Sequence, residues 1–182
     1  MSRGGIKLAA ALDAFGVSPA GWVCADLGSN VGGFVDCLLR RGAQRVYAID
    51  TGYGVLAYTL RTHPRVVVME RTNAIHVTLP EPVELVTIDV GWTRQHRILP
   101  NAIRMLRADG RIITLIKPHY EADKKQLRKG VLDSASARQS LETVCERITG
   151  TGAALERWIE SPIPGQKGNL EYLALLSVGK PA

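Results

Sequence analysis

The chain has 182 residues, 46% of them apolar, so it can bury the core of one domain without disulfide bonds or a structural metal. Its 23 lysines and arginines against 17 aspartates and glutamates leave a net charge of +6, which favours a polyanionic partner but also suits an ordinary charged surface. The three cysteines are widely spaced, which argues against a disulfide-rich protein. The N-terminus lacks an apolar leader, and the apolar runs are too short to cross a membrane. We therefore expect a soluble cytoplasmic protein.

Apolar runs typical of β-strands alternate along the chain with stretches whose apolar residues recur every three to four positions, as in amphipathic helices. The predicted strands are 22–27, 45–49, 65–69, 84–90, 111–116, 154–159 and 170–177. The predicted helices are 7–15, 31–41, 55–62, 95–106 and 135–149. This alternation predicts a mostly parallel sheet with helices on both faces.

The last two predicted strands follow each other without a helix, and only the turn around Ser161-Pro162-Ile163-Pro164-Gly165 separates them. This predicts an antiparallel hairpin at one edge of the sheet. Five strands with crossovers followed by such a hairpin is the order of a Rossmann-like class I methyltransferase, whereas a dinucleotide-binding fold would continue with parallel strands. We therefore expect a single α/β domain over residues 1–182, built on a seven-stranded sheet.

A glycine-rich turn follows the first predicted strand, where the sequence reads Asp26-Leu27-Gly28-Ser29-Asn30-Val31-Gly32-Gly33-Phe34. In the pyrophosphate fingerprint G-x-G-x-x-G the second glycine lets the backbone approach the phosphates, and here Asn30 occupies that position. The turn therefore favours S-adenosylmethionine, which has no phosphate, over a dinucleotide. We expect its amino-acid portion and ribose on the turn, with Asp26 near its ammonium group.

Further cofactor contacts are expected at the carboxyl ends of the next strands, where open α/β sheets bind ligands. Asp50 lies 22 positions after Gly28, where a carboxylate reaches the ribose hydroxyls, and Asn73 is placed to hydrogen-bond adenine. In the alternative interpretation the glycines only shape a turn and Asp50 only caps a helix. The predicted cofactor-binding residues are Asp26, Gly28, Ser29, Asn30, Gly32, Gly33, Phe34, Asp50, Thr51, Asn73 and Asp89.

Four ionisable residues fall on segments that should converge: Lys7, Asp89, Lys117 and Glu171. A ribose 2'-hydroxyl is a poor nucleophile, so its attack on a methyl sulfonium needs in-line placement and removal of its proton. A lysine can take that proton only if its pKa falls, which burial and a second ammonium favour and carboxylates oppose. The alternative for each of the four residues alone is an ordinary ion pair.

These motifs together resemble the TlyA, or hemolysin-A-like, ribosomal RNA methyltransferases, which share the FtsJ-type ribose methyltransferase fold. The likeness extends from Ser2 to about Ser177. It rests on Ser2-Arg3-Gly4-Gly5-Ile6-Lys7-Leu8, Asp26-Leu27-Gly28 with Gly32-Gly33-Phe34, Tyr47-Ala48-Ile49-Asp50 with Gly52-Tyr53-Gly54, Glu70-Arg71-Thr72-Asn73, Ile116-Lys117-Pro118 and Gly168-Asn169-Leu170-Glu171-Tyr172. The resemblance implies ribose 2'-O-methylation of ribosomal RNA, a catalytic tetrad of Lys7, Asp89, Lys117 and Glu171, and Lys117 as the general base.

The chain departs from the pattern of that family in two places. Members usually carry an N-terminal S4 RNA-binding domain, whereas this chain starts at the methyltransferase motif, so a protein partner is expected to supply RNA binding. After Asp89 the family tends to have a Ser-Phe-Ile-Ser-like segment, whereas this chain reads Val90-Gly91-Trp92-Thr93-Arg94-Gln95-His96-Arg97. That segment should border the target pocket, so the substrate is expected to differ or the activity to be lower.

Basic residues near the predicted catalytic strands indicate how ribosomal RNA or a ribosomal subunit would be held. Their contacts with phosphates would make affinity fall with salt, and Trp92 or Tyr120 would stack on an extruded base. The alternative is a solvated charged face with Trp92 in the core. The four histidines lack a ligand spacing, so we predict no required metal. The predicted RNA-binding residues are Arg3, Arg94, Arg97, Lys124, Lys125, Arg128 and Lys129.

Two other functions remain compatible with the sequence. A small-molecule methyltransferase would have a narrower cleft and would not require a polyanion. A degenerate module would still bind S-adenosylmethionine or RNA without chemistry; the four intact ionisable residues argue against it, and the altered segment after Asp89 argues for it.

Overall fold

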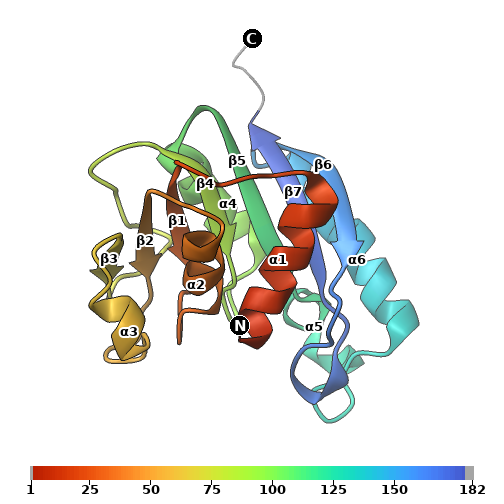
Figure 1. The fold of residues 1–182 in the computed structure, drawn as a ribbon. Coiled ribbons are helices and arrows are strands. Elements are labelled where there is room, and N and C mark those ends of the chain that lie inside the picture. The colour runs from red at the N-terminus through yellow and green to blue at the C-terminus, as the bar shows by residue number, and fades with distance from the viewer. Residues whose placement is uncertain (1, 179–182) are drawn as a thin grey trace.

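The computed structural model describes residues 2–178, in which a seven-stranded mixed sheet runs through the molecule with helices on both faces (Figure 1). The strands are β1 (Val23–Leu27), β2 (Arg45–Ile49), β3 (Val66–Met69), β4 (Val83–Ile88), β5 (Leu106–Ile116), β6 (Ala153–Glu160) and β7 (Tyr172–Val178). The α-helices are α1 (Arg3–Phe15), α2 (Gly33–Arg40), α3 (Tyr58–Arg61), α4 (Gln95–Met105), α5 (Pro118–Glu121) and α6 (Ser134–Thr149), and the short 3-10 helices are η1 (Lys124–Gln126) and η2 (Gln166–Gly168). The predicted α/β fold is confirmed.

The strand order is β3-β2-β1-β4-β5-β7-β6. Strands β1 to β5 are parallel, and β7 runs antiparallel to both β5 and β6. The predicted antiparallel hairpin at one edge is therefore confirmed, with β7 inserted between β5 and β6. Because the chain leaves β1 towards β2 and later returns to β4 on its other side, a crevice forms at the carboxyl ends of β1 and β4, where open α/β folds bind ligands.

Helix α1 begins at Arg3, four residues before the predicted start. Ser2 caps it, since its side-chain oxygen accepts a hydrogen bond from the amide of Gly5. Gly4 and Gly5 are weak helix formers, so the apolar pattern did not predict this first helical turn. Gly4 allows α1 to pack closely on α2, because a Cβ on Gly33 of α2 would lie 3.2 Å from the Cα of Gly4. The early start places Lys7 in the second turn of a capped, well-packed helix.

Strand β5 begins at Leu106, five residues before the predicted start at Arg111. The dipeptide Asp109-Gly110, predicted to separate a helix from a strand, instead lies inside β5, where the register with β4 shifts between Val83 and Leu85. The segment after Lys117, predicted as a loop, holds the short helix α5, which starts with a proline.

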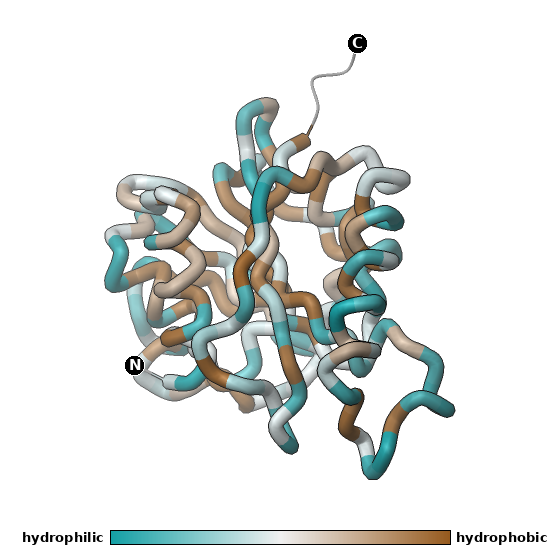
Figure 2. The backbone as a smooth tube through the Cα atoms, turned by 90° about the vertical axis from the view of Figure 1, so that its right-hand side faces the viewer, coloured by the Kyte–Doolittle hydropathy of each residue, from teal (hydrophilic) through white to brown (hydrophobic). Residues whose placement is uncertain are grey.

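The hydrophobic core lies in two layers, one on each face of the sheet. Side chains of α1, α2 and α3 pack with one face, and side chains of α4 and α6 pack with the other. Figure 2 shows hydrophobic residues concentrated in the strands at the centre and hydrophilic residues along the outer helices and loops. Within residues 2–178 no helix is long and apolar enough to cross a membrane.

Candidate active site

Two adjacent cavities lie at the carboxyl ends of β1, β2, β4 and β5. The larger has a volume of about 580 Å³ and is lined by the start of α1, the turn after β1, the residues that follow β4 and β5, and the segment before β7. The smaller, of about 330 Å³, lies over the ends of β2 and β3. Both are lined by Gly28, Asn30, Asp89 and Gly91, so they form neighbouring parts of one cleft.

Gly28 seats the turn after β1 against the end of β4. Its φ is +86°, and a Cβ at this position would lie 2.6 Å from the backbone oxygen of Asp89. The amides of Gly28 and Ser29 both donate to the carbonyl of Ile49 at 2.9 and 3.0 Å. Only glycine combines this backbone conformation with this close approach, so the turn opens directly onto the crevice between β1, β2 and β4.

Asp50 is held across the same turn by backbone amides. Its Oδ2 accepts from the amide of Asn30 at 2.8 Å, and its Oδ1 accepts from the amide of Gly52 at 2.7 Å. Each carboxylate oxygen keeps a further lone pair for a ligand in the smaller cavity. Thr51 and Asn73 line the same cavity, and Asn73 Oδ1 accepts from the amide of Ile75 at 3.0 Å, which leaves its Nδ2 hydrogens for a ligand. A carboxylate beside a carboxamide suits the diol and base of a nucleoside.

Of the predicted cofactor-binding residues, all except Gly32 line one of the two cavities. Gly32 has a φ of +97°, and a Cβ on it would lie 2.2 Å from Cδ1 of Leu60. A Cβ on Gly33 would lie 2.5 Å from Oγ of Ser2. The glycine pair therefore lets α2 pack closely on α3 and α1, and Gly32 lines neither cavity.

Asp26 is a buried carboxyl group at the wall of the larger cavity, only 1% exposed. It faces Thr87 on the neighbouring strand, and its Oδ1 accepts from the Thr87 hydroxyl at 2.7 Å. Its Oδ2 has no hydrogen-bond partner within residues 2–178. Burial raises the pKa of Asp26 to about 8, against the opposing effect of the Thr87 hydrogen bond. An unpartnered, buried carboxyl oxygen fits a cationic donor such as an ammonium group.

The structure brings Lys7, Asp89, Lys117 and Glu171 to the larger cavity as two ion pairs. Lys117 Nζ lies 2.6 Å from Asp89 Oδ1 and donates to the carbonyl of Val90 at 3.2 Å. Lys7 pairs with Glu171, and both residues are buried. Asp89 and Lys117 directly follow β4 and β5, whereas Glu171 precedes β7 and does not belong to it.

Gly165 makes room for the Glu171 side chain. A Cβ at Gly165 would lie 2.1 Å from Glu171 Oε1, so a larger residue would displace the carboxylate. The Gly165 amide donates to the carbonyl of Asn169 at 2.8 Å, which folds the segment back before β7 begins. The connection between β6 and β7 is therefore shaped to bring Glu171 to Lys7.

Two residues of α5 line the larger cavity although no role was predicted there for His119. The imidazole of His119 is buried, and its Nδ1 has no hydrogen-bond partner within residues 2–178. Burial, together with the charges of Lys117 and Lys7, lowers the pKa of His119 to about 4. The ring of Tyr120 lies 4.2 Å from that of His119 and 5.7 Å from Lys117 Nζ. The sequence signal for His119 was its position directly after Lys117-Pro118, whereas Tyr120 had been predicted as a stacking residue.

Trp92 lies at the surface, 77% exposed, so the interpretation that it belongs to the core is wrong. Its ring centroid is 4.5 Å from that of Tyr120, so the two aromatic residues that were predicted to stack on a base are neighbours. Arg3 lines the larger cavity, and its Nη2 donates to the carbonyl of Pro164 at 2.8 Å. The other predicted RNA-binding residues, Arg94, Arg97, Lys124, Lys125, Arg128 and Lys129, are all exposed.

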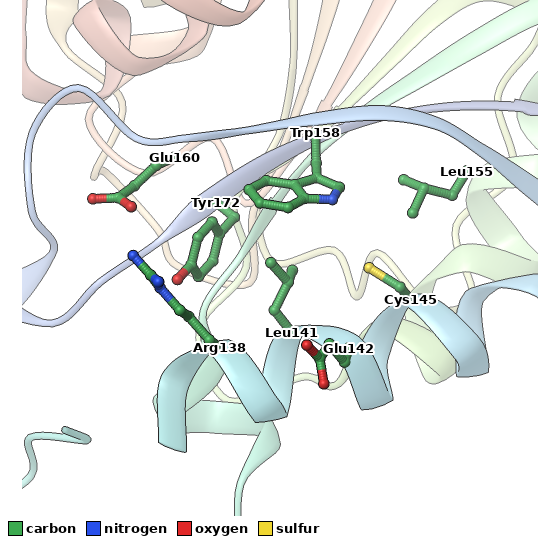
Figure 3. Close-up of a pocket in the computed structure, with 8 residues that line it drawn as sticks. All are labelled: Arg138, Leu141, Glu142, Cys145, Leu155, Trp158, Glu160 and Tyr172. Carbon is green, nitrogen blue, oxygen red and sulfur yellow. The ribbon is translucent and has the colours of Figure 1, made fainter. Parts of the chain in front are cut away.

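A separate hollow of about 460 Å³ lies between α6 and strands β6 and β7, and it contains none of the predicted site residues. Figure 3 shows the indole of Trp158 beside the ring of Tyr172, and these two rings meet edge to face at 5.6 Å. The apolar walls of the hollow include Leu141, Cys145 and Leu155, and the charged residues Arg138, Glu142 and Glu160 also line it. The glycine turn and the two lysine–carboxylate pairs lie elsewhere, so this hollow is not the candidate active site.

Comparison with known proteins matches residues 1–178 to the FtsJ-like methyltransferase family. The 16S/23S rRNA (cytidine-2'-O)-methyltransferase TlyA of Mycobacterium tuberculosis is 41% identical over 182 residues, covering 97% of this chain and 68% of that protein. The crystal structure of a "putative hemolysin" from Lactococcus lactis is similar with a TM-score of 0.92 and 36% identity, covering 97% of this chain and 87% of that one. An S-adenosylmethionine-dependent methyltransferase from Mesorhizobium loti, 16% identical over 92% of this chain and 95% of its own, shares the fold with a TM-score of 0.68.

Proposed function

The chain belongs to the FtsJ-like methyltransferase family, and from this we infer that it transfers a methyl group from S-adenosylmethionine to a ribose 2'-hydroxyl of ribosomal RNA. One observation carries the inference to this site: two lysine–carboxylate pairs border the same cavity as the glycine turn. The relative from M. tuberculosis, whose name gives this reaction on cytidine, is similar over nearly the whole chain.

The polar groups of the cleft fit S-adenosylmethionine. The unpartnered Oδ2 of Asp26 would hold its ammonium group, and the two oxygens of Asp50 would accept its ribose hydroxyls. Asn73 would contact the adenine, while Gly28 lets the backbone approach closely. When it is bound, S-adenosylmethionine supplies a methyl group on a positively charged sulfur, which an oxygen nucleophile can attack.

Lys117 is our candidate for the group that receives the proton of the 2'-hydroxyl. The Asp89 carboxylate and the Val90 carbonyl hold its Nζ at the end of β5, which fixes the direction of the remaining position on the nitrogen. The Lys117 side chain is partly exposed, so it can release a proton to water before the reaction. As the neutral amine it would then accept the hydroxyl proton as the ribose oxygen takes the methyl group and the bond between that methyl group and the cofactor sulfur breaks, which leaves a neutral thioether.

The second pair, Lys7 and Glu171, adds a fixed ammonium to the same cavity. This ammonium stabilises negative charge that develops on the attacking oxygen. Glu171 holds Lys7 in place and satisfies its charge in a buried position. We thus assign the Lys117–Asp89 pair to proton acceptance and the Lys7–Glu171 pair to stabilising charge on the attacking oxygen.

The aromatic pair of Trp92 and Tyr120 is our candidate platform for the target base. Trp92 holds a left-handed backbone conformation, with a φ of 62°, that is unfavourable for a bulky residue. Such strain at an exposed aromatic residue indicates a functional contact. Arg94 and Arg97 follow Trp92 at the start of α4, and Lys124 and Lys125 follow Tyr120 in η1, so phosphate-binding charge accompanies each ring.

The test is transfer of radiolabelled methyl groups from S-adenosylmethionine to ribosomal subunits and naked ribosomal RNA that lack the modification. Nuclease digestion then locates the label, and we expect it on a 2'-oxygen. The Lys117→Met variant should bind S-adenosylmethionine with unchanged affinity in calorimetry but transfer no label. The matched control is Lys167→Met, which removes an exposed lysine of η2 and should keep transfer. Cofactor binding by the wild type without label on RNA would refute the proposal and favour a small-molecule substrate or a binding module.

A further inference from the structure

His119 is a buried polar residue inside the candidate active site to which the proposed function assigns no role. It is 8% exposed and lines the same cavity as the two lysine–carboxylate pairs. Its Nδ1 is buried without a hydrogen-bond partner among residues 2–178. A buried polar atom without a partner costs free energy, so such an atom in a cavity indicates a contact that a ligand completes.

The surroundings of His119 keep its imidazole neutral. Lys117 precedes it by two residues, and Lys7 reaches it from α1; both ammonium groups oppose a third positive charge. Burial acts in the same direction and is the largest effect. The carboxylates of the cavity do not offset this, because Asp89 and Glu171 pair with the two lysines. A neutral imidazole offers one N–H donor and one acceptor nitrogen.

The position of His119 matches the nucleotide rather than the cofactor. It lines the larger cavity with Lys117, away from Asp50 and Asn73, which line only the smaller one; Asp26, the candidate contact of the cofactor's ammonium group, also borders the larger cavity. Its ring lies against Tyr120, whose other neighbours are Trp92 and the Nζ of Lys117. The imidazole therefore lies where the sugar of a nucleotide would meet Lys117 if its base stacked on the aromatic pair.

We propose that His119 donates a hydrogen bond from an imidazole N–H to the 2'-oxygen of the target ribose, leaving the hydroxyl proton directed to Lys117. This inference rests on the proposed function. The contact positions the attacking oxygen and no proton moves to or from the imidazole. Because phosphate contacts at the basic residues supply most of the affinity for RNA, loss of the His119 contact lowers the turnover number more than it raises KM for RNA.

Two substitutions separate this contact from a structural role. His119→Leu fills a similar volume without hydrogen-bonding groups, and His119→Gln keeps a donor that does not titrate near neutral pH. Each is compared with the wild type for methyl transfer to unmodified ribosomal RNA across pH 6 to 9, and for S-adenosylmethionine affinity by calorimetry. We expect His119→Leu to lower kcat roughly tenfold, the effect of one hydrogen bond, with KM for RNA and cofactor affinity nearly unchanged. His119→Gln should have a kcat within about threefold of the wild-type value and should keep the wild-type pH profile.

Three results would overturn the inference. Wild-type kcat in His119→Leu would show that no contact is made, and an equal loss of cofactor affinity in that variant would show that the residue only supports the site. A changed pH profile in His119→Gln would show that the imidazole exchanges a proton. Absence of transfer by the wild type itself would instead refute the proposed function, and the inference about His119 with it.

Discussion

Replacement of Asp26 by asparagine should make the unbound protein more stable, by an amount that grows as the pH rises. The substitution keeps an oxygen for the hydroxyl of Thr87, which Asp26 Oδ1 accepts at 2.7 Å. It removes a carboxyl group that is buried and whose Oδ2 has no partner within the described residues. Asparagine therefore removes the cost of burying a charge and keeps the hydrogen bond to β4.

The sign and size of this change in stability follow from the pKa of Asp26, which burial raises from 3.8 to about 8. Between these values the folded chain holds a proton that the unfolded chain has released, so the free energy of unfolding falls as pH rises. The penalty is absent below about pH 4 and complete above about pH 8. It grows by about 1.4 kcal/mol per pH unit and reaches about 6 kcal/mol in total.

Urea unfolding of the wild type and of Asp26→Asn at pH 5.5, 6.5 and 7.5 measures the free-energy cost of keeping Asp26 buried. The stability advantage of Asp26→Asn should increase by about 3 kcal/mol across the series. Asp109→Asn makes the same chemical change at a side chain that is 91% exposed, and its effect should not vary with pH in this range. A constant difference between Asp26→Asn and the wild type would refute the reasoning, because it would mean that Asp26 is already ionised in the folded protein at pH 5.5.

Three further predictions test the cleft. Gly28→Ala should lower the free energy of unfolding by at least about 2 kcal/mol in urea titrations, because its Cβ would lie 2.6 Å from the Asp89 oxygen at a positive φ. The control Gly91→Ala, whose Cβ would have no atom within 4 Å, should change the free energy of unfolding little. Asp50→Ala should weaken S-adenosylmethionine binding in calorimetry about 10- to 100-fold, as expected for lost charge-assisted hydrogen bonds, and unchanged affinity would show that the ribose contact is misplaced. Trp92→Ala should raise KM for RNA about tenfold without changing the melting temperature, because the side chain is exposed and base stacking contributes roughly 1–3 kcal/mol; equal KM values would remove the stacking platform.

Much of the fold could be predicted because apolar runs and turn residues mark parallel strands and their crossovers. The exceptions have local causes. The first turn of α1 contains Gly4 and Gly5, whose weak helix propensity is overcome by the Ser2 cap and by packing on α2. The dipeptide Asp109-Gly110 usually marks a turn, but here it lies within β5, where pairing with β4 is irregular.

The residues that line the candidate site could be predicted better than the contacts that they make with one another. Residues at strand ends, such as Asp50, Asp89 and Lys117, could be placed because parallel strands share one carboxyl edge. Which lysine pairs with which carboxylate depends on side-chain directions from separate elements, which no spacing encodes. The packing of Gly32 against Leu60 could not be predicted, because a glycine needed for helix packing has the same sequence signature as one needed by a ligand. The role of His119 depends on burial and on two nearby cations, both of which are tertiary properties.

The Lys7–Glu171 pair joins residues 164 positions apart and therefore has a consequence for synthesis of the protein. Among residues 2–178, strand β6 pairs only with β7, and β7 must enter between β5 and β6 before the sheet is complete. Contacts of such long sequence separation form late, because a long loop must close before they stabilise anything. A nascent chain that is still held by the ribosome short of Glu171 thus has Lys7 without its buried ion-pair partner. The candidate site can therefore assemble only after Glu171 has emerged from the ribosome.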